Sequence, residues 1–284
     1  MKNIWKSLEN MNNYIAYKEE LLKFLFDNIK EYNKKEIKNF LKYGSILVND
    51  KVITKHNYML KDNDIVKVNI FNKDKNIDIL YEDKDLIVVN KESGILVVDN
   101  ETNKNKTLYN LVSEYVKKNN KNNKIFIVHR LDQDTSGIVV FAKNEKIKRI
   151  LQDNWNEIVL TRKYIAIVEG NINESGVIKN YLNENKNHFV YISNKGKFAI
   201  TEYKKIKSNE KYSWVDINLK TGRKNQIRVH FKSIGHPVVG DIKYGNKNDE
   251  FNRLCLHAYE LSFINPINNK KMLFTSPIPK KILK

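Results

Sequence analysis

One segment of the sequence, residues 129–137, places the residue types that nucleophilic and acid–base chemistry needs beside a turn. Its order is His-Arg-Leu-Asp-Gln-Asp-Thr-Ser-Gly, with Asp132 near the centre. Apolar residues typical of strands lie on both sides, at 125–128 and 138–141. We interpret the pattern as a strand that is interrupted, presents polar side chains and resumes, because this arrangement places side chains in a cleft. The alternative is a surface loop in which Asp132 and Thr135 only form the turn.

Three later segments extend this pattern. They are residues 162–170, which contain Lys-Tyr-x-Ala-x-Val-x-Gly, residues 196–203, which read Gly-Lys-x-Ala-x-Thr-x-Tyr, and residues 221–230, which read Thr-Gly-Arg-x-Asn-Gln-Ile-Arg-x-His. Together with residues 129–137 they resemble the catalytic domain of the RluA-type pseudouridine synthases, in which the Asp of His-Arg-Leu-Asp is the nucleophile. The resemblance implies an isomerase that detaches a uracil from its ribose in RNA, turns it and rejoins it through carbon 5.

On this resemblance the catalytic residues are Asp132, Tyr164 and Arg228. Asp132 would attack the sugar, attack the base or act at the 2′ position, and these three possibilities stay open. Arg228 would be the partner that a buried carboxylate needs. Tyr164 would stack on the extruded uracil and help to move the proton from carbon 5, with a core tyrosine as the alternative. Asn225 stands where the family commonly has His, and we expect only a local change in hydrogen bonding there.

Extruding a base from an RNA helix costs free energy, so further side chains must bind the RNA. We expect Arg130 to enter the space that the base leaves. We expect His129 to contact a phosphate, and a structural histidine is an equal alternative. Lys163 and Arg223 are the other expected RNA contacts, although a solvated arginine is equally compatible with Arg223. Ile227 is expected as an apolar wall beside the stacked ring, or as a plain core residue.

We expect structural roles for two turns near these residues. The hydroxyls of Thr135 and Ser136 should satisfy backbone groups, and Gly137 should allow a close approach of another chain segment. At residues 91–94 the family's usual Lys-Pro-x-Gly turn reads Lys-Glu-Ser-Gly. The missing proline predicts a less rigid turn with unchanged chemistry.

The composition favours a polyanionic partner. The 284 residues include 51 Lys and Arg against 33 Asp and Glu, a formal net charge of +18, although a general richness in lysine contributes to it. The single cysteine, Cys255, cannot form an internal disulfide and lies in an apolar run. We expect neither metal nor cofactor, because the sequence has no Cys/His cluster and no glycine loop for a nucleotide. Residues 1–17 are polar and no apolar run could span a membrane, so we expect a cytoplasmic protein, monomeric by default.

The N-terminal part is predicted to be a separate small domain. Residues 15–70 combine a helical pattern, a hairpin around 49–50 and a last strand after a turn at 63–64. They resemble an S4-type RNA-binding domain, with a generic small α+β module as the alternative. S4 domains usually have Asn-Gly at the first of these turns and Gly-Asp at the second. This sequence has Asn-Asp at both, and Asn and Asp tolerate the same turn conformations. Residues 1–14 are expected to be a frayed lead-in and the lysine-rich residues 71–77 a linker.

Residues 78–284 are predicted to form the catalytic domain. Strand-like segments outnumber two amphipathic helices, one capped by Thr107 and one at 144–155. The expected fold class is α+β. In detail, we expect the pseudouridine synthase fold, a large, mainly antiparallel mixed sheet with flanking helices and a central catalytic cleft, preceded by a small α/β S4-like domain.

We therefore expect an RNA pseudouridine synthase that acts on structured RNA. Large-subunit (23S) ribosomal RNA or a ribosome precursor is the first candidate substrate, and transfer RNA is the alternative. A non-catalytic, S4-tethered RNA-binding or ribosome-associated factor is the rival from another class, and the intact set of Asp132, Tyr164 and Arg228 argues against it. A glycosidase needs two carboxylates that flank one bond, and the turn at 135–137 argues against such a role for Asp134.

Overall fold

The computed structural model describes residues 11–30, 32–42, 45–49, 51–69, 77–98, 107–246 and 251–283. It divides into two compact units, Met1–Asn76 and Ile77–Lys284, each with its own hydrophobic core. The second unit begins one residue before the expected start at 78, because Ile77 packs against its core. Residues 71–76 of the expected linker lie outside the described residues. None of the described helices is long and apolar enough to cross a membrane.

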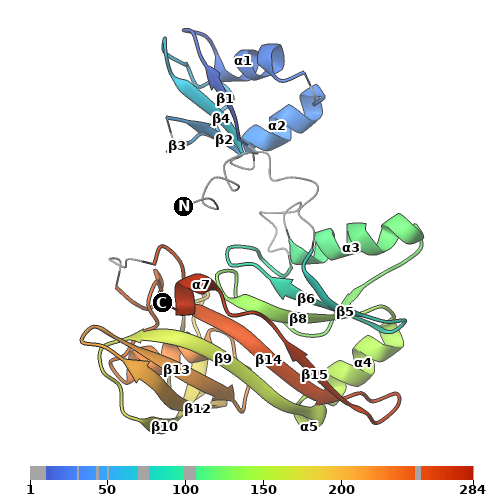
Figure 1. The fold of residues 1–284 in the computed structure, drawn as a ribbon, viewed down its shortest axis with the longest axis vertical. Coiled ribbons are helices and arrows are strands. Elements are labelled where there is room, and N and C mark those ends of the chain that lie inside the picture. Colours follow the sequence, from blue (N-terminus) through green and yellow to red (C-terminus); the bar gives the residue numbers. More distant parts are fainter. Residues whose placement is uncertain are drawn as a thin grey trace. The chain divides into compact units, whose positions relative to one another are not determined.

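The first unit combines two helices with a four-stranded sheet (Figure 1). Its elements are β1 (Met11–Ile15), α1 (Leu21–Asn28), α2 (Lys34–Lys42), β2 (Ile46–Val48), β3 (Lys51–Val52) and β4 (Ile65–Asn69). All strand pairs are antiparallel, in the order β1-β4-β2-β3. Leu25 of α1 and Ile37 of α2 share one core with Val66 of β4, so apolar stripes of both helices face the sheet.

Strand β1 corrects the expectation that residues 1–14 are a frayed lead-in. Its backbone pairs with β4 over its whole length, from Met11 opposite Asn69 to Ile15 opposite Ile65. The segment has no alternation of apolar and polar residues and its partner lies far along the chain, so no local pattern indicates a strand. Residues 1–10 lie outside the described residues.

The two expected turns of the first unit adopt the left-handed conformation. Asn49 has φ 48° and Asn63 has φ 66°, in the region that Asn tolerates better than most residues. The Asn49 side chain accepts a hydrogen bond from the Ile65 amide (2.9 Å) and donates to Asp64 (2.8 Å). Asn at these turns is therefore compatible with the turn geometry, as expected, and its side chain also ties the two turns together.

The second unit is built on one mixed sheet of eleven strands, with helices against both faces (Figure 1). Its elements are β5 (Ile79–Glu82), β6 (Leu86–Lys91), α3 (Leu108–Asn119), β7 (Phe126–Ile127), β8 (Ser136–Ala142), α4 (Glu145–Asp153), α5 (Trp155–Ile158), β9 (Val159–Glu169), β10 (Ser175–Glu184), β11 (Val190–Ile192), β12 (Lys197–Ser208), β13 (Tyr212–Leu219), α6 (Gln226–Ser233), β14 (Leu256–Ile264), β15 (Lys271–Thr275) and α7 (Lys280–Leu283). The strand order is β11-β10-β12-β13-β9-β14-β8-β6-β5, with β15 beside β14 and β7 beside β8. The pair β14–β8 is parallel and the other pairs are antiparallel, which confirms the expected large, mainly antiparallel mixed sheet.

Side-chain alternation along β6 sends successive residues into two different cores. Val88 packs in the core that contains Leu151 of α4, whereas Val89 packs in the core that contains Val112 of α3. The two helices therefore cover opposite faces of this part of the sheet (Figure 1).

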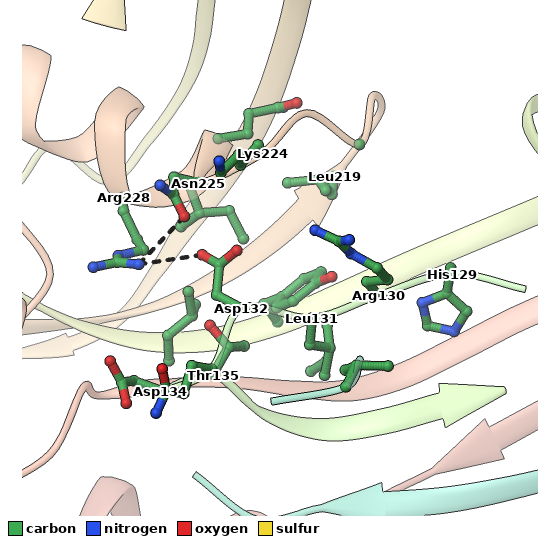
Figure 2. A pocket seen from close by; sticks show the side chains of 18 of the residues that line it. His129, Arg130, Leu131, Asp132, Asp134, Thr135, Leu219, Lys224, Asn225 and Arg228 are labelled. Carbon is green, nitrogen blue, oxygen red and sulfur yellow. Dashed lines mark hydrogen bonds and ion pairs between the residues drawn. The ribbon is translucent and has the colours of Figure 1, made fainter. Parts of the chain in front are cut away.

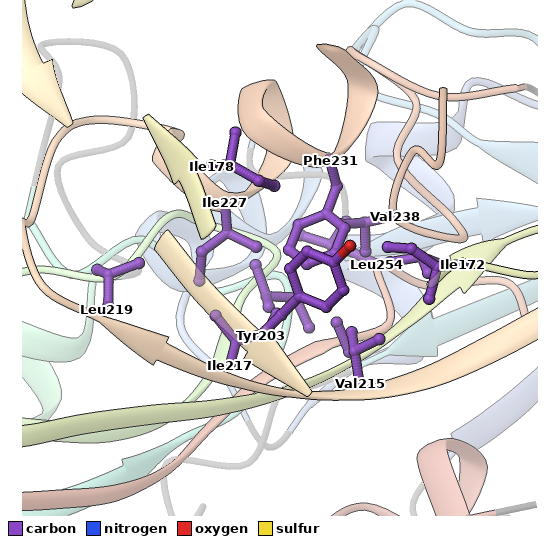
Figure 3. Close-up of a cluster of buried hydrophobic side chains, with 13 residues drawn as sticks. Ile172, Ile178, Tyr203, Val215, Ile217, Leu219, Ile227, Phe231, Val238 and Leu254 are labelled. Carbon is purple, nitrogen blue, oxygen red and sulfur yellow. The ribbon is translucent and has the colours of Figure 1, made fainter. Parts of the chain in front are cut away.

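A further core fixes α6 on the strands next to it. Ile227 and Phe231 lie four residues apart, on one face of α6, and pack against Ile178, Tyr203 and Ile217 of the sheet (Figure 3). This buried face sets the rotation of the helix. The next residue after Ile227, Arg228, consequently points to another side.

The segment 129–137 does not interrupt one continuous strand, which corrects our interpretation. Strand β7 before it pairs antiparallel with β8 after it, with Phe126 opposite Ala142 and Ile127 opposite Phe141. The chain therefore reverses direction between the two strands, and Asp132 lies in the connecting loop. Apolar runs on both sides fit a reversal as well as an interruption, because hydrophobic periodicity carries no information on chain direction.

Candidate active site

A cavity of about 1030 Å³ opens in the second unit beside the loop that carries Asp132 (Figure 2). Its other walls come mainly from residues 222–228, which lead into α6, and from β14, with Arg162 and Tyr164 of β9. Seven of the eight predicted site residues line it: Asp132, Tyr164, Arg228, His129, Arg130, Arg223 and Ile227. The cavity is in the size range of sites that enclose a small organic molecule, and a single nucleotide is of that size.

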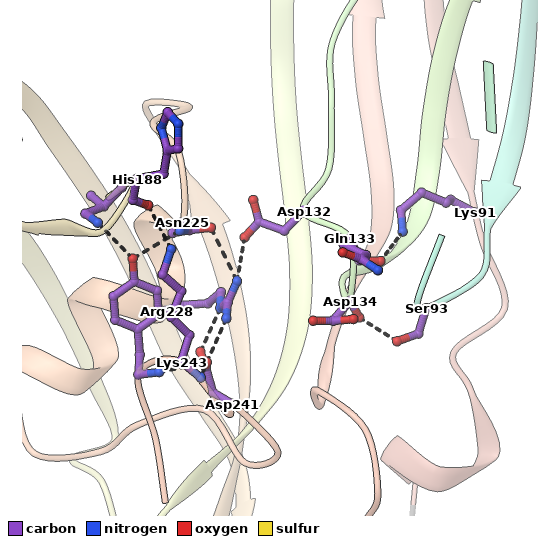
Figure 4. A network of polar contacts seen from close by, with 12 residues as sticks. Lys91, Ser93, Asp132, Gln133, Asp134, His188, Asn225, Arg228, Asp241 and Lys243 are labelled. Atoms are coloured by element: carbon purple, nitrogen blue, oxygen red, sulfur yellow. Dashed lines mark hydrogen bonds and ion pairs between the residues drawn. The ribbon is translucent and has the colours of Figure 1, made fainter. Parts of the chain in front are cut away.

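Asp132 faces Arg228, which is itself held by a second carboxylate (Figure 4). One oxygen of Asp132 lies 3.4 Å from Nη1 of Arg228. Nε and Nη2 of Arg228 donate to the two oxygens of Asp241, each at 2.7 Å. Burial by itself lowers the pKa of Arg228, but the hydrogen bonds and charge of Asp241, with a contribution from Asp132, outweigh it and raise that pKa. The guanidinium beside Asp132 therefore stays charged, and its orientation is set by Asp241, a residue without a predicted role.

Asn225 completes the contacts of Asp132. It is the residue before α6, and its backbone has the left-handed conformation that Asn tolerates, with φ 52°. This conformation directs its side chain toward Asp132. With the amide nitrogen toward the carboxylate, it donates to both oxygens of Asp132 (2.8 and 3.1 Å) and accepts from the Tyr244 hydroxyl (3.0 Å). In the opposite orientation, drawn in Figure 2, the amide oxygen accepts from Arg228 at 3.3 Å. We assign the first orientation because it satisfies both Asp132 and Tyr244, and Arg228 keeps its contact with Asp132.

Tyr164 stands on β9, partly buried against the core under α6. Burial raises the pKa of its hydroxyl to about 12, so the phenol is protonated at neutral pH. A protonated phenol is a hydrogen-bond donor and a poor proton acceptor. Its place in the lining of the cavity is compatible with the stacking part of its expected role.

Arg162 lines the same cavity, and we did not predict it. Strand alternation places it on the face of β9 that carries Tyr164. It donates to the carbonyls of Leu219 (3.1 Å) and Lys220 (2.7 Å), and burial lowers its pKa. The sequence could have indicated Arg162, because it lies two residues before Tyr164 and alternate residues of a strand share a face.

Lys163 does not line the cavity, so its expected contact with RNA would have to lie outside it. Successive side chains of a strand point to opposite faces, so Lys163 points away from the face that carries Tyr164. Its Nζ lies 3.9 Å from Asp216 of β13 instead.

His129 has the contacts of a structural histidine. Its Nε2 accepts a hydrogen bond from the Val140 amide (3.2 Å), and its ring stacks on Trp155 with centroids 5.0 Å apart. Burial lowers the pKa of His129 to about 4, with a smaller contribution from Arg162, so the ring is neutral at pH 7. A neutral, engaged imidazole is a weak phosphate ligand, and these contacts favour the structural alternative.

The two predicted arginines at the edge of the cavity are exposed. Arg130 lies in the loop of Asp132, and Arg223 lies just before α6. Nε of Arg223 donates to the carbonyl of Phe198 (3.0 Å), which leaves the other guanidinium nitrogens to bind an anion. Both positions are compatible with contacts to RNA.

Lys91 and its neighbours form hydrogen bonds to the backbone of the loop that carries Asp132 (Figure 4). Lys91 is fully buried, and its amine donates to three backbone carbonyls, those of Glu92 (2.9 Å), Ile95 (2.8 Å) and Gln133 (2.7 Å). The Ser93 hydroxyl donates to the Asp134 carbonyl (2.7 Å). These hydrogen bonds join the turn at 91–94 to the loop, so the structure supplies the rigidity that the missing proline put in question.

Ser136 and Gly137 join the end of the loop to β14. The Ser136 hydroxyl lies 2.9 Å from Nδ1 of His257 and accepts a hydrogen bond from Arg253 (2.7 Å). Gly137 has φ 119°, and a Cβ there would overlap the carbonyl of Ala258. The expected close approach at Gly137 is thus confirmed.

Comparison with known proteins agrees with this geometry. The family model described as RNA pseudouridylate synthase matches residues 85–233, which include Asp132, Tyr164 and Arg228. The RNA pseudouridine synthase YhcT of Bacillus subtilis (strain 168) is 33% identical over 260 residues, which cover 87% of this chain and 86% of that protein. The chain belongs to the RNA pseudouridylate synthase family. It is therefore an isomerase of RNA, as expected from its sequence.

Other members of the family show the same extent of similarity. The ribosomal large subunit pseudouridine synthase D of Buchnera aphidicola is 31% identical over 277 residues, which cover 89% of each chain. The structure of human RNA pseudouridylate synthase domain containing 4 superimposes with a TM-score of 0.60 at 22% identity, over 72% of this chain and 90% of that chain. This similarity shows that the pseudouridine synthase fold is shared.

Proposed function

We propose that this protein isomerises specific uridines in large-subunit ribosomal RNA, with Asp132 as the nucleophile acting on an extruded uridine. The observation that carries the proposal is the position of Asp132 in the cavity, in contact with Arg228 and, in the assigned orientation, with Asn225. The substrate class is supported by relatives named ribosomal large subunit pseudouridine synthase C or D in Buchnera and Borreliella.

The proposed reaction needs no group beyond the uridine and this chain. Asp132 forms a bond with the nucleoside, the bond between ribose and nitrogen 1 of uracil breaks, and the uracil turns inside the cavity. Carbon 5 then joins the ribose, and the bond to Asp132 breaks with its electron pair returning to the carboxylate. The proton on carbon 5 is lost and nitrogen 1 takes up a proton, so that the product is an isomer of the substrate. Arg228 and Asn225 orient the carboxylate, which lowers the cost of reaching a reactive geometry. Tyr164 offers a ring on which the free uracil can stack.

We further propose that residues 15–70 form an S4-like RNA-binding domain. Two features support it, namely the two helices packed on a small sheet and the left-handed asparagine turns. Exposed lysines on α2, Lys34, Lys35 and Lys38, supply positive charge for phosphate contacts. Replacing all three with Gln should raise the KM for RNA and leave kcat unchanged. An unchanged KM would contradict this role for α2.

The decisive experiment maps pseudouridine across ribosomal and transfer RNA in cells that lack the protein. Wild-type, Asp132→Asn and Asp134→Asn copies are returned separately. Asp134 is an exposed carboxylate two residues away, so Asp134→Asn controls for the change of charge. We expect a large-subunit site that the wild type and Asp134→Asn restore and Asp132→Asn does not.

Purified proteins complete the test. Asp132→Asn should bind an unmodified large-subunit RNA transcript with nearly wild-type affinity and form no pseudouridine. A normal rate for this variant would overturn the assigned nucleophile. Release of free uracil by the wild type would indicate a glycosidase instead. A site that is lost only from transfer RNA would overturn the substrate class.

A further inference from the structure

Ile242 is the most exposed large apolar side chain among the described residues, with 81% of its surface accessible, and it lines the cavity of Asp132. Apolar side chains at a site that binds a partner gain free energy when the partner covers them. We therefore expect a binding partner to cover Ile242. Because Ile242 lines the cavity of Asp132, this partner is the ligand that enters the cavity.

The backbone of Ile242 is held in a rigid turn. Asp241, which precedes it, is buried, and its Oδ1 accepts hydrogen bonds from the amides of Lys243 (3.0 Å) and Tyr244 (2.9 Å). Gly240 has φ 79°, and a Cβ there would overlap the carbonyl of Arg253. The turn is thus fixed on both sides of Ile242. A β-branched side chain on such a turn has few rotamers to lose when it binds.

The same turn is tied to the reacting groups. The Asp241 carboxylate that organises the turn also binds Arg228 through two hydrogen bonds, and Arg228 contacts Asp132 (Figure 4). On the other side, Nζ of Lys243 donates to the carbonyl of His188 (2.8 Å). These contacts hold Ile242 near Asp132, because the central link, Asp241 to Arg228, is made by buried groups.

We infer that Ile242 is a substrate-contacting residue that packs against the base next to the extruded uridine. This inference rests on the proposed function. Extruding the uridine exposes the face of the neighbouring base, and covering that face with an apolar side chain offsets part of the unstacking cost. Ile is among the side chains that proteins insert between bases in this way. The turn of Ile242 and the loop of Arg130 are separate segments, so the two side chains can act on the RNA independently.

The first test compares Ile242→Ser with Ile267→Ser in full-length protein. Ile267 is an exposed isoleucine in another turn, outside the lining of the cavity, and serves as the matched control. The rate of pseudouridine formation is measured in a single turnover on an unmodified large-subunit RNA transcript. We expect Ile242→Ser to lower the rate about tenfold, as the loss of part of a buried isoleucine contact would. Ile242→Leu should retain most of the rate, and Ile267→Ser should match the wild type.

The second test asks what Ile242 touches. The bases on the 5′ and 3′ sides of the mapped uridine are replaced, one at a time, with an abasic residue. On one of these RNAs the difference between wild type and Ile242→Ser should disappear, because the surface that Ile242 covers is gone. This coupling is a readout that a purely structural defect would not produce.

The outcomes separate the two proposals. If Ile242→Ser reacts as fast as Ile267→Ser, or if its defect is the same on both abasic RNAs, the contact with a neighbouring base is wrong. If the wild type forms no pseudouridine on the transcript and restores no site in cells, the proposed function fails first. Equal urea midpoints for the two serine variants and the wild type verify that neither change unfolds the protein.

Discussion

Asp241 and Arg228 are joined by two hydrogen bonds of 2.7 Å each. The carboxylate is fully buried, and the guanidinium side chain is only 9% exposed. The contact of Arg228 with Asp132 is longer, at 3.4 Å. Asp241 therefore sets the position of the guanidinium, and Asp132 meets a positive charge that is already oriented. A site organised in this way needs little rearrangement when the substrate enters.

Replacing Asp241 should damage both the fold and the site. Asp241→Ala leaves the buried guanidinium of Arg228 without its main partner, which typically costs about 3–5 kcal/mol. We expect the free energy of unfolding in urea to fall by this order, and turnover to fall with it. The control is Asp134→Ala, which removes an exposed carboxylate. If both variants unfold at the same urea concentration, the pair does not stabilise the protein.

The amide of Asn225 should matter for turnover. Asn225→Gly keeps the backbone at φ 52° without strain and removes the donor to Asp132. A hydrogen bond to a charged group contributes about 1.5–3 kcal/mol, so we expect the single-turnover rate to fall about tenfold to a hundredfold. RNA affinity should change little. Asn225→Ala should lose stability in addition, because it strains the left-handed backbone. A normal rate for Asn225→Gly would exclude a contact of this amide with Asp132 during the reaction.

The buried amine of Lys91 predicts a pH dependence of stability. Burial lowers the pKa of Lys91 from 10.5 to about 7. Between these values the unfolded chain keeps the proton and the folded protein releases it, giving up one of the three N–H donors, so the free energy of unfolding rises with pH through this window. Lys91→Met lacks this contribution. Urea unfolding from pH 7 to pH 10 should therefore show the wild type gaining stability relative to Lys91→Met. Parallel curves would mean that the three carbonyl acceptors keep the amine protonated in the folded protein.

Gly137 should tolerate no side chain. In Gly137→Ala the new Cβ meets the carbonyl of Ala258 as well as an unfavourable φ of 119°. Gly94→Ala is the matched control, since Gly94 has φ 88° but open space around it. Strained backbone alone costs about 1–3 kcal/mol, and we expect Gly137→Ala to lose clearly more than Gly94→Ala in thermal unfolding. Equal losses would show that β8 and β14 can move apart at this point.

Local patterns in the sequence determined much of the fold. Thr107 accepts a hydrogen bond from Asn110 at the start of α3, and Asn144 accepts one from Ile147 at the start of α4. Both helices were expected from apolar spacing, and the first also from its cap at Thr107, because caps and periodicity act within a few residues. The resemblance to the RluA-type pseudouridine synthases likewise implied that Asp132, Tyr164 and Arg228 belong to one site, and all three line the cavity.

The tertiary structure decided what connects these residues. Asp241 as the partner of Arg228, Lys91 behind the loop of Asp132, and the pairing of β1 with β4 are contacts between segments that are distant in sequence. The reversal between β7 and β8 is of the same kind. Periodicity and caps report which face of an element is apolar and where it begins. They do not report which elements meet, because that depends on how the whole sheet pairs and packs.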